Sequence, residues 1–189
     1  MKVLIACEFS GRVRDAFIRR GHDAWSCDLI PADGPHLQTD VRNVLSDGWD
    51  LMIAHPPCTR LCNSGVRWLH ERDLWDEMHA ACDLFNLLLN APIPRIAVEN
   101  PTMHGYARGR IRPPDQAYHP WQFGAGETKR TCLWLKGLPK LVPTTPDAKE
   151  RKASCHLASP GPNRWKIRSL TPLGVAEAMA EQWSRYAKG

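Results

Sequence analysis

Short apolar runs that alternate with helical patterns constrain the fold of this chain more than any other feature of its sequence. Each run has the length of a buried strand. The runs are KVLIAC at 2–7, the segment 22–29, WDLMIAH at 49–55, IAVEN at 96–100 and TCLWL at 131–135. Strands that alternate with helices through short connections indicate an α/β fold with a doubly wound, mostly parallel sheet, which binds ligands at the carboxyl ends of its strands.

The segments between these runs complete the expected organisation. A helical pattern follows Gly11 and stops at Gly21, a second covers 69–89 before Pro92, and a terminal helix is expected over 171–183. Two further stretches lack such a pattern. Residues 102–126 are rich in Gly, Pro, His and aromatic residues, which predicts an ordered active-site loop, and the proline-rich stretch 137–163 shows little periodicity.

Length and composition favour one ordinary globular domain over residues 1–189. Of the 189 residues, 43% are hydrophobic and 24% are charged. No run approaches the roughly 20 apolar residues that cross a bilayer, and the N-terminus has no cleavage site of the secretory kind, so we expect a cytoplasmic protein. The seven cysteines lack the paired spacing of a zinc site, so no metal is expected and all but Cys58 are interpreted as reduced and structural.

The net charge of +5 is concentrated in the second half of the chain, between Lys129 and Arg168. Such an excess suggests a polyanionic partner, although a moderate positive charge also serves plain solubility.

Polar residues follow the first two strands, at the edge where a ligand is expected. Phe9-Ser10-Gly11 opens a helix directly after the first strand, where backbone N–H groups can accept parts of a nucleoside cofactor. Asp28 ends the second strand, where a carboxylate can bind both hydroxyls of a ribose, and Asp40 follows in a turn. For any one of these acidic residues, a helix cap or a solvated turn is the simpler interpretation.

A cysteine and a glutamate follow two later strands. In Pro56-Pro57-Cys58 the prolines fix the backbone and aim the cysteine into the cleft, which makes it a candidate nucleophile, although most cysteines are inert and buried. Glu99-Asn100-Pro101 then places a carboxyl group at another strand end. A thiol and a carboxyl group that converge on one site suggest covalent catalysis with acid assistance.

In this order, the motifs FSG, Asp28, Asp40, PPC and ENP resemble those of the DNA cytosine-C5 methyltransferase family. Compact phage-encoded members look most similar. Pro57-Cys58 matches the family's Pro-Cys motif, and Glu99-Asn100 matches its Glu-Asn motif. The resemblance implies a Rossmann-like methyltransferase fold that uses S-adenosyl-L-methionine on DNA.

The resemblance also implies roles for individual residues. Cys58 would attack C6 of a flipped-out or single-stranded cytosine, while Glu99 assists at N3. The cofactor-binding residues would be Phe9, Ser10, Gly11, Asp28, Asp40 and Pro57. The family's Gln-x-Arg-x-Arg motif aligns Lys129 with its first arginine, which makes Lys129 a catalytic candidate, and Thr131 with its second. The substrate-binding candidates are Asn100, Arg130, Arg164 and Arg168.

Departures from the family leave other functions open. The region that reads DNA sequence would shrink to a minimal target-recognition insertion at 137–168. RNA or a free nucleotide is therefore an alternative substrate. A carboxylated derivative of S-adenosyl-L-methionine is an alternative donor, and it would require a cation beside the sulfonium. A non-catalytic nucleic-acid-binding module is the alternative from a different class. The sequence predicts no oligomeric state.

Overall fold

The computed structural model describes residues 1–145, 151, 161 and 164–187, and within them it has a seven-stranded sheet in the order β3-β2-β1-β4-β5-β7-β6. The paired strands from β3 to β5 are parallel, whereas β7 runs antiparallel to both of its neighbours, β5 and β6. The strands are β1 (Lys2–Ala6), β2 (Asp23–Asp28), β3 (His36–Gln38), β4 (Leu51–Ala54), β5 (Arg95–Pro101), β6 (Gln116–Tyr118) and β7 (Thr131–Lys136).

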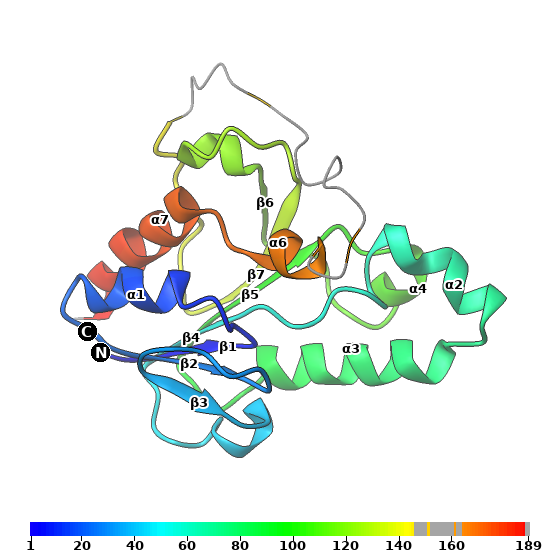
Figure 1. Ribbon diagram of the computed structural model, residues 1–189, viewed down its shortest axis with the longest axis horizontal. Coiled ribbons are helices and arrows are strands. Elements are labelled where there is room, and N and C mark those ends of the chain that lie inside the picture. The colour runs from blue at the N-terminus through cyan, green and yellow to red at the C-terminus, as the bar shows by residue number, and fades with distance from the viewer. Residues whose placement is uncertain (146–150, 152–160, 162–163, 188–189) are drawn as a thin grey trace.

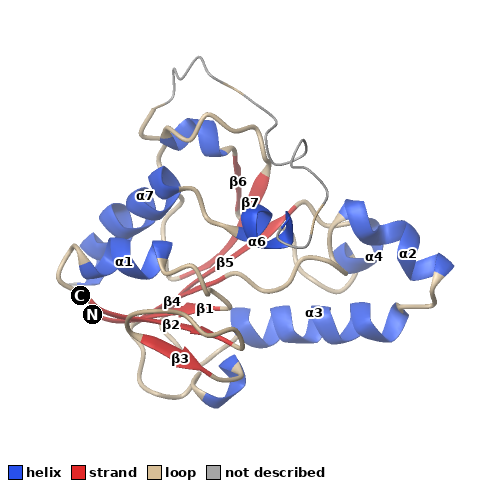
Figure 2. Ribbon diagram, viewed as in Figure 1, coloured by secondary structure: helices blue, strands red, loops and turns tan. Residues whose placement is uncertain are grey.

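Helices cover both faces of this sheet (Figures 1 and 2). The α-helices are α1 (Arg12–Ile18), α2 (Val66–Glu71), α3 (Trp75–Leu89), α4 (Gly105–Arg108), α6 (Arg164–Ser169) and α7 (Leu173–Ser184). Short 3-10 helices are η1 (Val41–Asn43), η2 (Asn63–Gly65), η3 (Pro120–Phe123) and η4 (Arg185–Ala187). Helices α1 and α7 pack together on one face, and α3 lies on the other.

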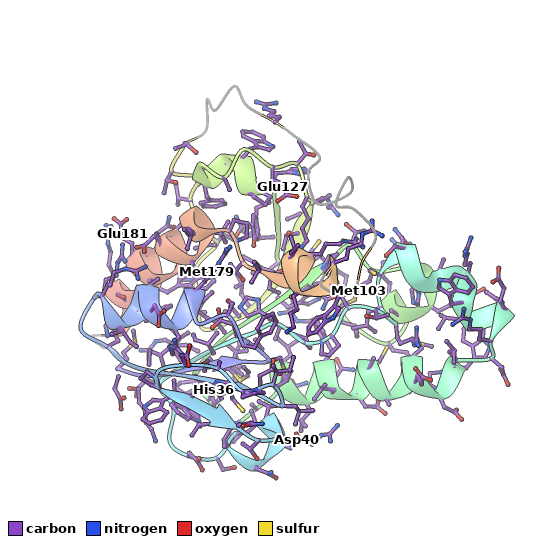
Figure 3. The ribbon with its side chains drawn as sticks, viewed as in Figure 1. His36, Asp40, Met103, Glu127, Met179 and Glu181 are labelled. Atoms are coloured by element: carbon purple, nitrogen blue, oxygen red, sulfur yellow. The ribbon has the colours of Figure 1, made fainter. Side chains whose placement is uncertain are left out.

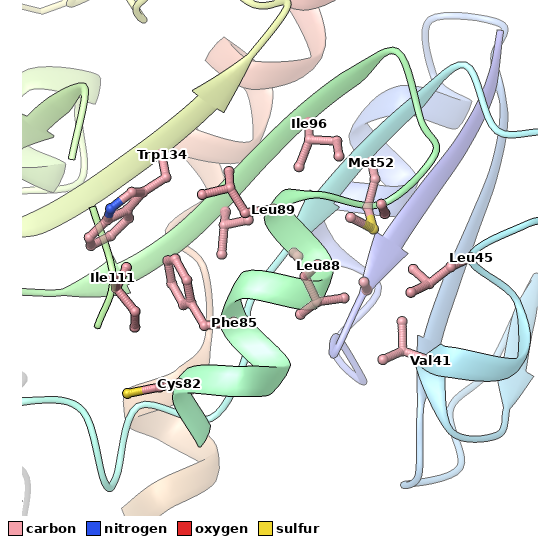
Figure 4. Close-up of a cluster of buried hydrophobic side chains, with 14 of the residues drawn as sticks. Val41, Leu45, Met52, Cys82, Phe85, Leu88, Leu89, Ile96, Ile111 and Trp134 are labelled. Atoms are coloured by element: carbon pink, nitrogen blue, oxygen red, sulfur yellow. The ribbon is translucent and has the colours of Figure 1, made fainter. Parts of the chain in front are cut away.

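Apolar side chains on both faces of the strands explain this layered arrangement. All four residues of β4 are buried, as expected for a parallel strand that is covered on both sides. On the α3 face, Phe85 packs edge-on against Trp134 of β7, with ring centroids 4.9 Å apart (Figure 4). On the opposite face, Phe17 of α1 and Trp183 of α7 are fully buried. The two cores hold the strands, and therefore their ends, in place.

The predicted mostly parallel α/β sheet is confirmed, but two strands and one helix boundary differ from expectation. The edge strands β3 and β6 were not predicted, because each has only three residues and no apolar run. The single helix expected over 69–89 is wrong, since α2 and α3 are separate. Asp73 lies between them with a φ of 49°, a left-handed conformation that interrupts a helix.

Of the two stretches that lack a regular pattern in the sequence, the structure describes 102–126 in full and 137–163 only in part. Residues 102–126 contain α4, β6 and η3, so this region is largely ordered structure around the strand ends. Half of the expected target-recognition insertion at 137–168, namely residues 146–150, 152–160 and 162–163, lies outside the described residues. Among the described helices, none is long and apolar enough to span a membrane.

Candidate functional site

The candidate site lies where three neighbouring strands, β1, β4 and β5, end at one edge of the sheet. Ala6 pairs with Ala54, and Ala54 pairs with Val98, so the next residues in each strand are level with one another. Those residues are Cys7, His55 and Glu99. The sheet register therefore brings residues from three distant parts of the sequence into one row.

Asn100 links the ENP strand end to the loop that carries Cys58. Its Nδ2 donates a hydrogen bond to the main-chain carbonyl of Pro56 at 3.0 Å, and the residue is only 1% exposed. The carbonyl of Cys58 then accepts hydrogen bonds from the backbone N–H groups of Leu61 and Cys62, at 2.9 and 3.0 Å. These contacts fix the half-buried Cys58 at the start of a tight turn.

Cys62 lies one turn beyond Cys58 and interacts with its side chain. The contact with Cys62, and then burial, raise the pKa of the Cys58 thiol, so Cys58 holds its proton in the resting protein. The same contact, together with a hydrogen bond to the Ser64 hydroxyl, lowers the pKa of Cys62. The sulfur of Cys62 is 3.1 Å from Ser64 Oγ. Negative charge on this pair is therefore favoured at Cys62, which was predicted to be only structural.

Glu99 forms a hydrogen-bonded pair with His55. His55 Nδ1 lies 3.0 Å from Glu99 Oε2, and the two side chains are 11% and 13% exposed. Burial raises the pKa of Glu99, but the hydrogen bond and the charge of His55 lower it by more, so that the pKa lies below its ordinary value. Burial lowers the pKa of His55, and the same partner reverses that change, so that the pKa is raised. The contact thus favours the form of the pair with an imidazolium and a carboxylate.

Lys129 adds a positive charge to the site. Its ammonium lowers the pKa of both Cys58 and Glu99, which places it near the thiol and the carboxyl group. The ammonium donates a hydrogen bond to the carbonyl of Arg168 at 3.1 Å, so α6 lies against Lys129. Arg130, by contrast, is exposed and bonds to Thr102.

The loop after β1 is shaped by Glu8. This side chain is 5% exposed, and its Oε1 accepts hydrogen bonds from Ser10 Oγ and the backbone N–H of Val13, at 2.8 and 3.0 Å. The loop also contains two left-handed residues, Cys7 with a φ of 56° and Gly11 with a φ of 70°. A left-handed cysteine is uncommon, and such strain often accompanies a ligand site.

Asp28 and Asp40 border the same loop. Both carboxylates raise the pKa of Cys7, after the larger effect of burial, so both lie near it. Asp28 Oδ1 accepts the N–H of Ile30 at 3.0 Å, and Asp40 caps η1 by accepting the N–H of Arg42 at 2.9 Å. Figure 3 shows Asp40 beside the edge strand β3. Each acidic residue thus has a local structural role.

Buried polar atoms indicate that this edge is built for a ligand. Glu8 Oε2, His55 Nε2 and Asn100 Oδ1 have no hydrogen-bond partner among the residues that the structure describes. Leaving a buried polar atom unsatisfied costs about 1–3 kcal/mol. Since all three atoms lie at the ends of β1, β4 and β5, a polar molecule bound there would offset this cost.

The structure brings most of the predicted site residues to this edge, in two groups. Phe9, Ser10, Gly11, Asp28 and Asp40 surround the loop after β1, whereas Pro57, Cys58, Glu99, Asn100 and Lys129 surround the ends of β4 and β5. Arg164 and Arg168 lie on α6, and Arg168 reaches Lys129 through its carbonyl. Arg130 donates hydrogen bonds to Thr102 Oγ1 and to the sulfur of Cys132.

Sequence reasoning missed Glu8, His55 and the role of Cys62. A signal for the first two existed, because each is a polar residue that directly follows an apolar strand. Cys62 carried no such signal, since its contact with Cys58 depends on the turn between them.

No protein-family model matches this chain, and no curated protein matches it by sequence. Among solved structures, it is similar to the Entamoeba histolytica methyltransferase EhMeth, with a TM-score of 0.52 and 11% identity over 84% of this chain and 60% of that one. It is also similar to a protein described as a DNA modification methyltransferase of an E. coli prophage, with a TM-score of 0.46 and 14% identity over 70% of this chain and 45% of that one. The chain spans about half the length of these proteins. It has a Rossmann-like methyltransferase fold.

Proposed function

We propose that this chain is an S-adenosyl-L-methionine-dependent methyltransferase that modifies C5 of cytosine in DNA through a covalent adduct between Cys58 and C6. The observation that carries the proposal is the junction of the two predicted motifs, in which Asn100 bonds to Pro56 beside Cys58 while Glu99 stands on the adjacent strand. The resemblance to the cytosine-C5 methyltransferase family, together with the methyltransferase fold, supports this choice.

The residues around the loop after β1 fit the cofactor. Glu8 Oε2 is a buried carboxylate oxygen that lacks a described partner, and the ammonium of a methionine moiety is a donor of matching charge. Phe9, Ser10 and Gly11 would line the loop, Asp28 and Asp40 would bind ribose hydroxyls or the adjoining base, and Pro57 would face the same group. When bound, this cofactor supplies an electrophilic methyl group.

The chain's own residues would activate the pyrimidine ring. The thiol of Cys58 must lose its proton before its sulfur adds to C6. The lowered pKa of Cys62 leaves its sulfur as a thiolate, and this thiolate is the neighbouring atom to which the proton can pass through the contact between the two side chains. Glu99 would direct a proton to N3 and so stabilise the charge that develops in the ring. Lys129 would face the carbonyl side of the base. It would replace the second arginine of the family's motif, which is Thr131 in this chain.

Basic residues support a nucleic acid as substrate. Arg130 is exposed near the site, Arg164 and Arg168 belong to α6, and the chain carries a net charge of +5. These residues would contact phosphates and so position the strand, while Asn100 Oδ1 stays available to the base. RNA, a free nucleotide and a carboxylated donor are distinguished by the products of the reaction. The cytoplasm is the proposed location.

DNA that contains 5-fluorocytosine tests the proposal directly. Fluorine cannot leave as a cation, so an enzyme that works through C6 stays bonded to the base after transfer. We expect the wild-type protein to migrate with the DNA under denaturing conditions when S-adenosyl-L-methionine is present, and to separate from it when the cofactor is left out. Mass spectrometry of the modified base distinguishes a methyl group from a carboxymethyl group.

Matched variants locate the adduct. Cys58→Ser should abolish it, whereas Cys82→Ser should not, because Cys82 is fully buried on α3. Glu99→Gln should slow adduct formation about 100-fold if its proton assists at N3. Methyl transfer by Cys58→Ser at the wild-type rate would overturn the C5 assignment and favour an exocyclic nitrogen as the acceptor.

A further inference from the structure

We propose that His55 is a positioning residue for Glu99, which fixes the orientation of the resting carboxylate and holds the proton that Glu99 delivers to N3 of the base. This inference rests on the proposed function, because it assigns the source of the proton in that reaction. It starts from the contact between His55 Nδ1 and Glu99 Oε2 at 3.0 Å.

The main chain holds His55 rigidly beside Glu99. The backbone N–H of His55 donates to the carbonyl of Ala6 at 2.9 Å, which continues the pairing of β4 with β1. Pro56 follows directly, and its carbonyl is held by Asn100. The main chain is therefore held on both sides of His55, and its imidazole contacts one of the two carboxylate oxygens of Glu99, Oε2.

The charges around the pair favour a shared proton. The carboxylate of Glu8, at the end of β1, favours the imidazolium, and Lys129 before β7 opposes it. Among the described residues, Cys58, Tyr118 of β6 and Cys132 of β7 are the other titratable groups that interact with this pair, and the raised pKa of each keeps it uncharged near neutral pH. His55 and Glu99 are hydrogen-bonded and buried, so they titrate as a coupled pair, and the raised pKa of His55 keeps the proton on this pair to higher pH than on an ordinary histidine.

The pair with His55 provides a proton that Glu99 alone does not hold. Glu99 is held as a carboxylate, and a carboxylate has no proton to give. The imidazolium supplies one: the proton moves from Nδ1 to Oε2, which ends the ion pair, and the neutral carboxyl group then rotates and passes the proton from Oε2 to N3. His55 ends neutral, Glu99 ends as a carboxylate again, and N3 carries the proton while sulfur is bonded to C6. The proton returns along the same path when the thiolate leaves.

The pH dependence of adduct formation tests this role. His55→Asn is the matched variant, because the Asn Nδ2 replaces Nδ1 as a donor to Oε2 but has no proton to release. In the wild type, the rate should fall about tenfold per pH unit only above the raised pKa of the pair. In His55→Asn, Glu99 must hold the proton itself, and burial then raises the pKa of its carboxyl group, so the alkaline limb should move by at least about one unit to lower pH and activity should be highest at the acid end of the profile. His55→Gln, whose amide cannot take the place of Nδ1, should lose activity at every pH.

A second measurement does not depend on catalysis. The imidazole resonances of His55, recorded by NMR as pH is varied, should show a titration above the ordinary histidine value of about 6.5 in the wild type and below it in Glu99→Gln, where burial outweighs the remaining effect of Glu8. A histidine that titrates at or below its ordinary value in the wild type overturns the proposal. So does a His55→Asn enzyme that is slower by one factor at all pH values with an unmoved alkaline limb. Absence of an adduct in the wild type at every pH contradicts the proposed function instead, and the NMR titration still decides whether His55 stores the proton.

Discussion

Asn100 Nδ2 donates a hydrogen bond to the carbonyl of Pro56 at 3.0 Å, and this contact joins the two motifs of the candidate site across adjacent strands. Asn100 and Pro56 are both buried, so loss of the Asn100 side chain would leave the carbonyl of Pro56 without a hydrogen-bond partner inside the protein.

Asn100→Ala should therefore destabilise the protein and misplace the nucleophile. We expect a loss of about 1–3 kcal/mol in the free energy of unfolding, measured by urea denaturation. Adduct formation with 5-fluorocytosine DNA should slow by a larger factor than this stability loss explains at 25 °C, where the variant is still folded. A variant that is less stable but reacts at the wild-type rate would limit Asn100 to a structural role.

Gly11 is required in the loop after β1 by both its conformation and its surroundings. Its φ is 70°, and a Cβ built there would lie 2.4 Å from Nη2 of Arg14. Arg14 is buried and cannot move freely, because it bonds to Ser26 Oγ and to the carbonyl of Asp33 at 3.0 and 2.6 Å. Gly11→Ala should thus cost about 3 kcal/mol or more and weaken cofactor binding.

Gly21→Ala is the control for Gly11→Ala. Gly21 has a similar φ of 79°, but no heavy atom lies within 4 Å of a Cβ built there. We expect only the backbone cost of about 1–2 kcal/mol, with cofactor affinity unchanged in calorimetry. Equal effects of the two substitutions would show that the contact with Arg14 is not what makes Gly11 necessary.

The sequence predicted the site to the extent that strand ends can be located one at a time. Cys58 and Glu99 were found because each follows an apolar run, and the order β1-β4-β5 then places those ends together. The pairing of His55 with Glu99 required the register between β4 and β5, which no local pattern specifies. The edge strands were missed for a related reason. Residues such as His36 and Gln38 form a strand through their neighbour β2 rather than through their own propensity.

Asp28 and Asp40 are expected to contribute differently to cofactor binding. Asp28 uses one described side-chain oxygen on Ile30, whereas both carboxylate oxygens of Asp40 bind Arg42. In calorimetry with S-adenosylhomocysteine, Asp28→Ala should weaken binding by about 1–3 kcal/mol. Asp40→Ala should weaken it less and should instead reduce stability through the lost η1 cap. Unchanged affinity in Asp28→Ala removes that residue from the site.

Cys58 and Cys62 together should ionise at lower pH than an isolated thiol. One sulfur of the pair can carry the charge while the other donates its S–H, and Ser64 adds a further hydrogen bond to Cys62, whose pKa is lowered. We expect alkylation by iodoacetamide at this pair, followed by mass spectrometry, to begin well below the ordinary cysteine pKa of about 8.5.

Cys62→Ser separates the two sulfurs. Cys58 then loses the neighbour that would accept its proton, while burial still raises its pKa, so alkylation of Cys58 should move to higher pH than in the wild type. Adduct formation at pH 7 should slow in the same variant, although the adduct should still form, because the nucleophile itself is intact. Cys58→Ser should keep an alkylation limb below about 8.5, since Ser64 still stabilises the charge on Cys62. If Cys62→Ser instead retains the low-pH limb and the wild-type adduct rate, the readily ionised sulfur is Cys58, and it attacks the base without help from its neighbour.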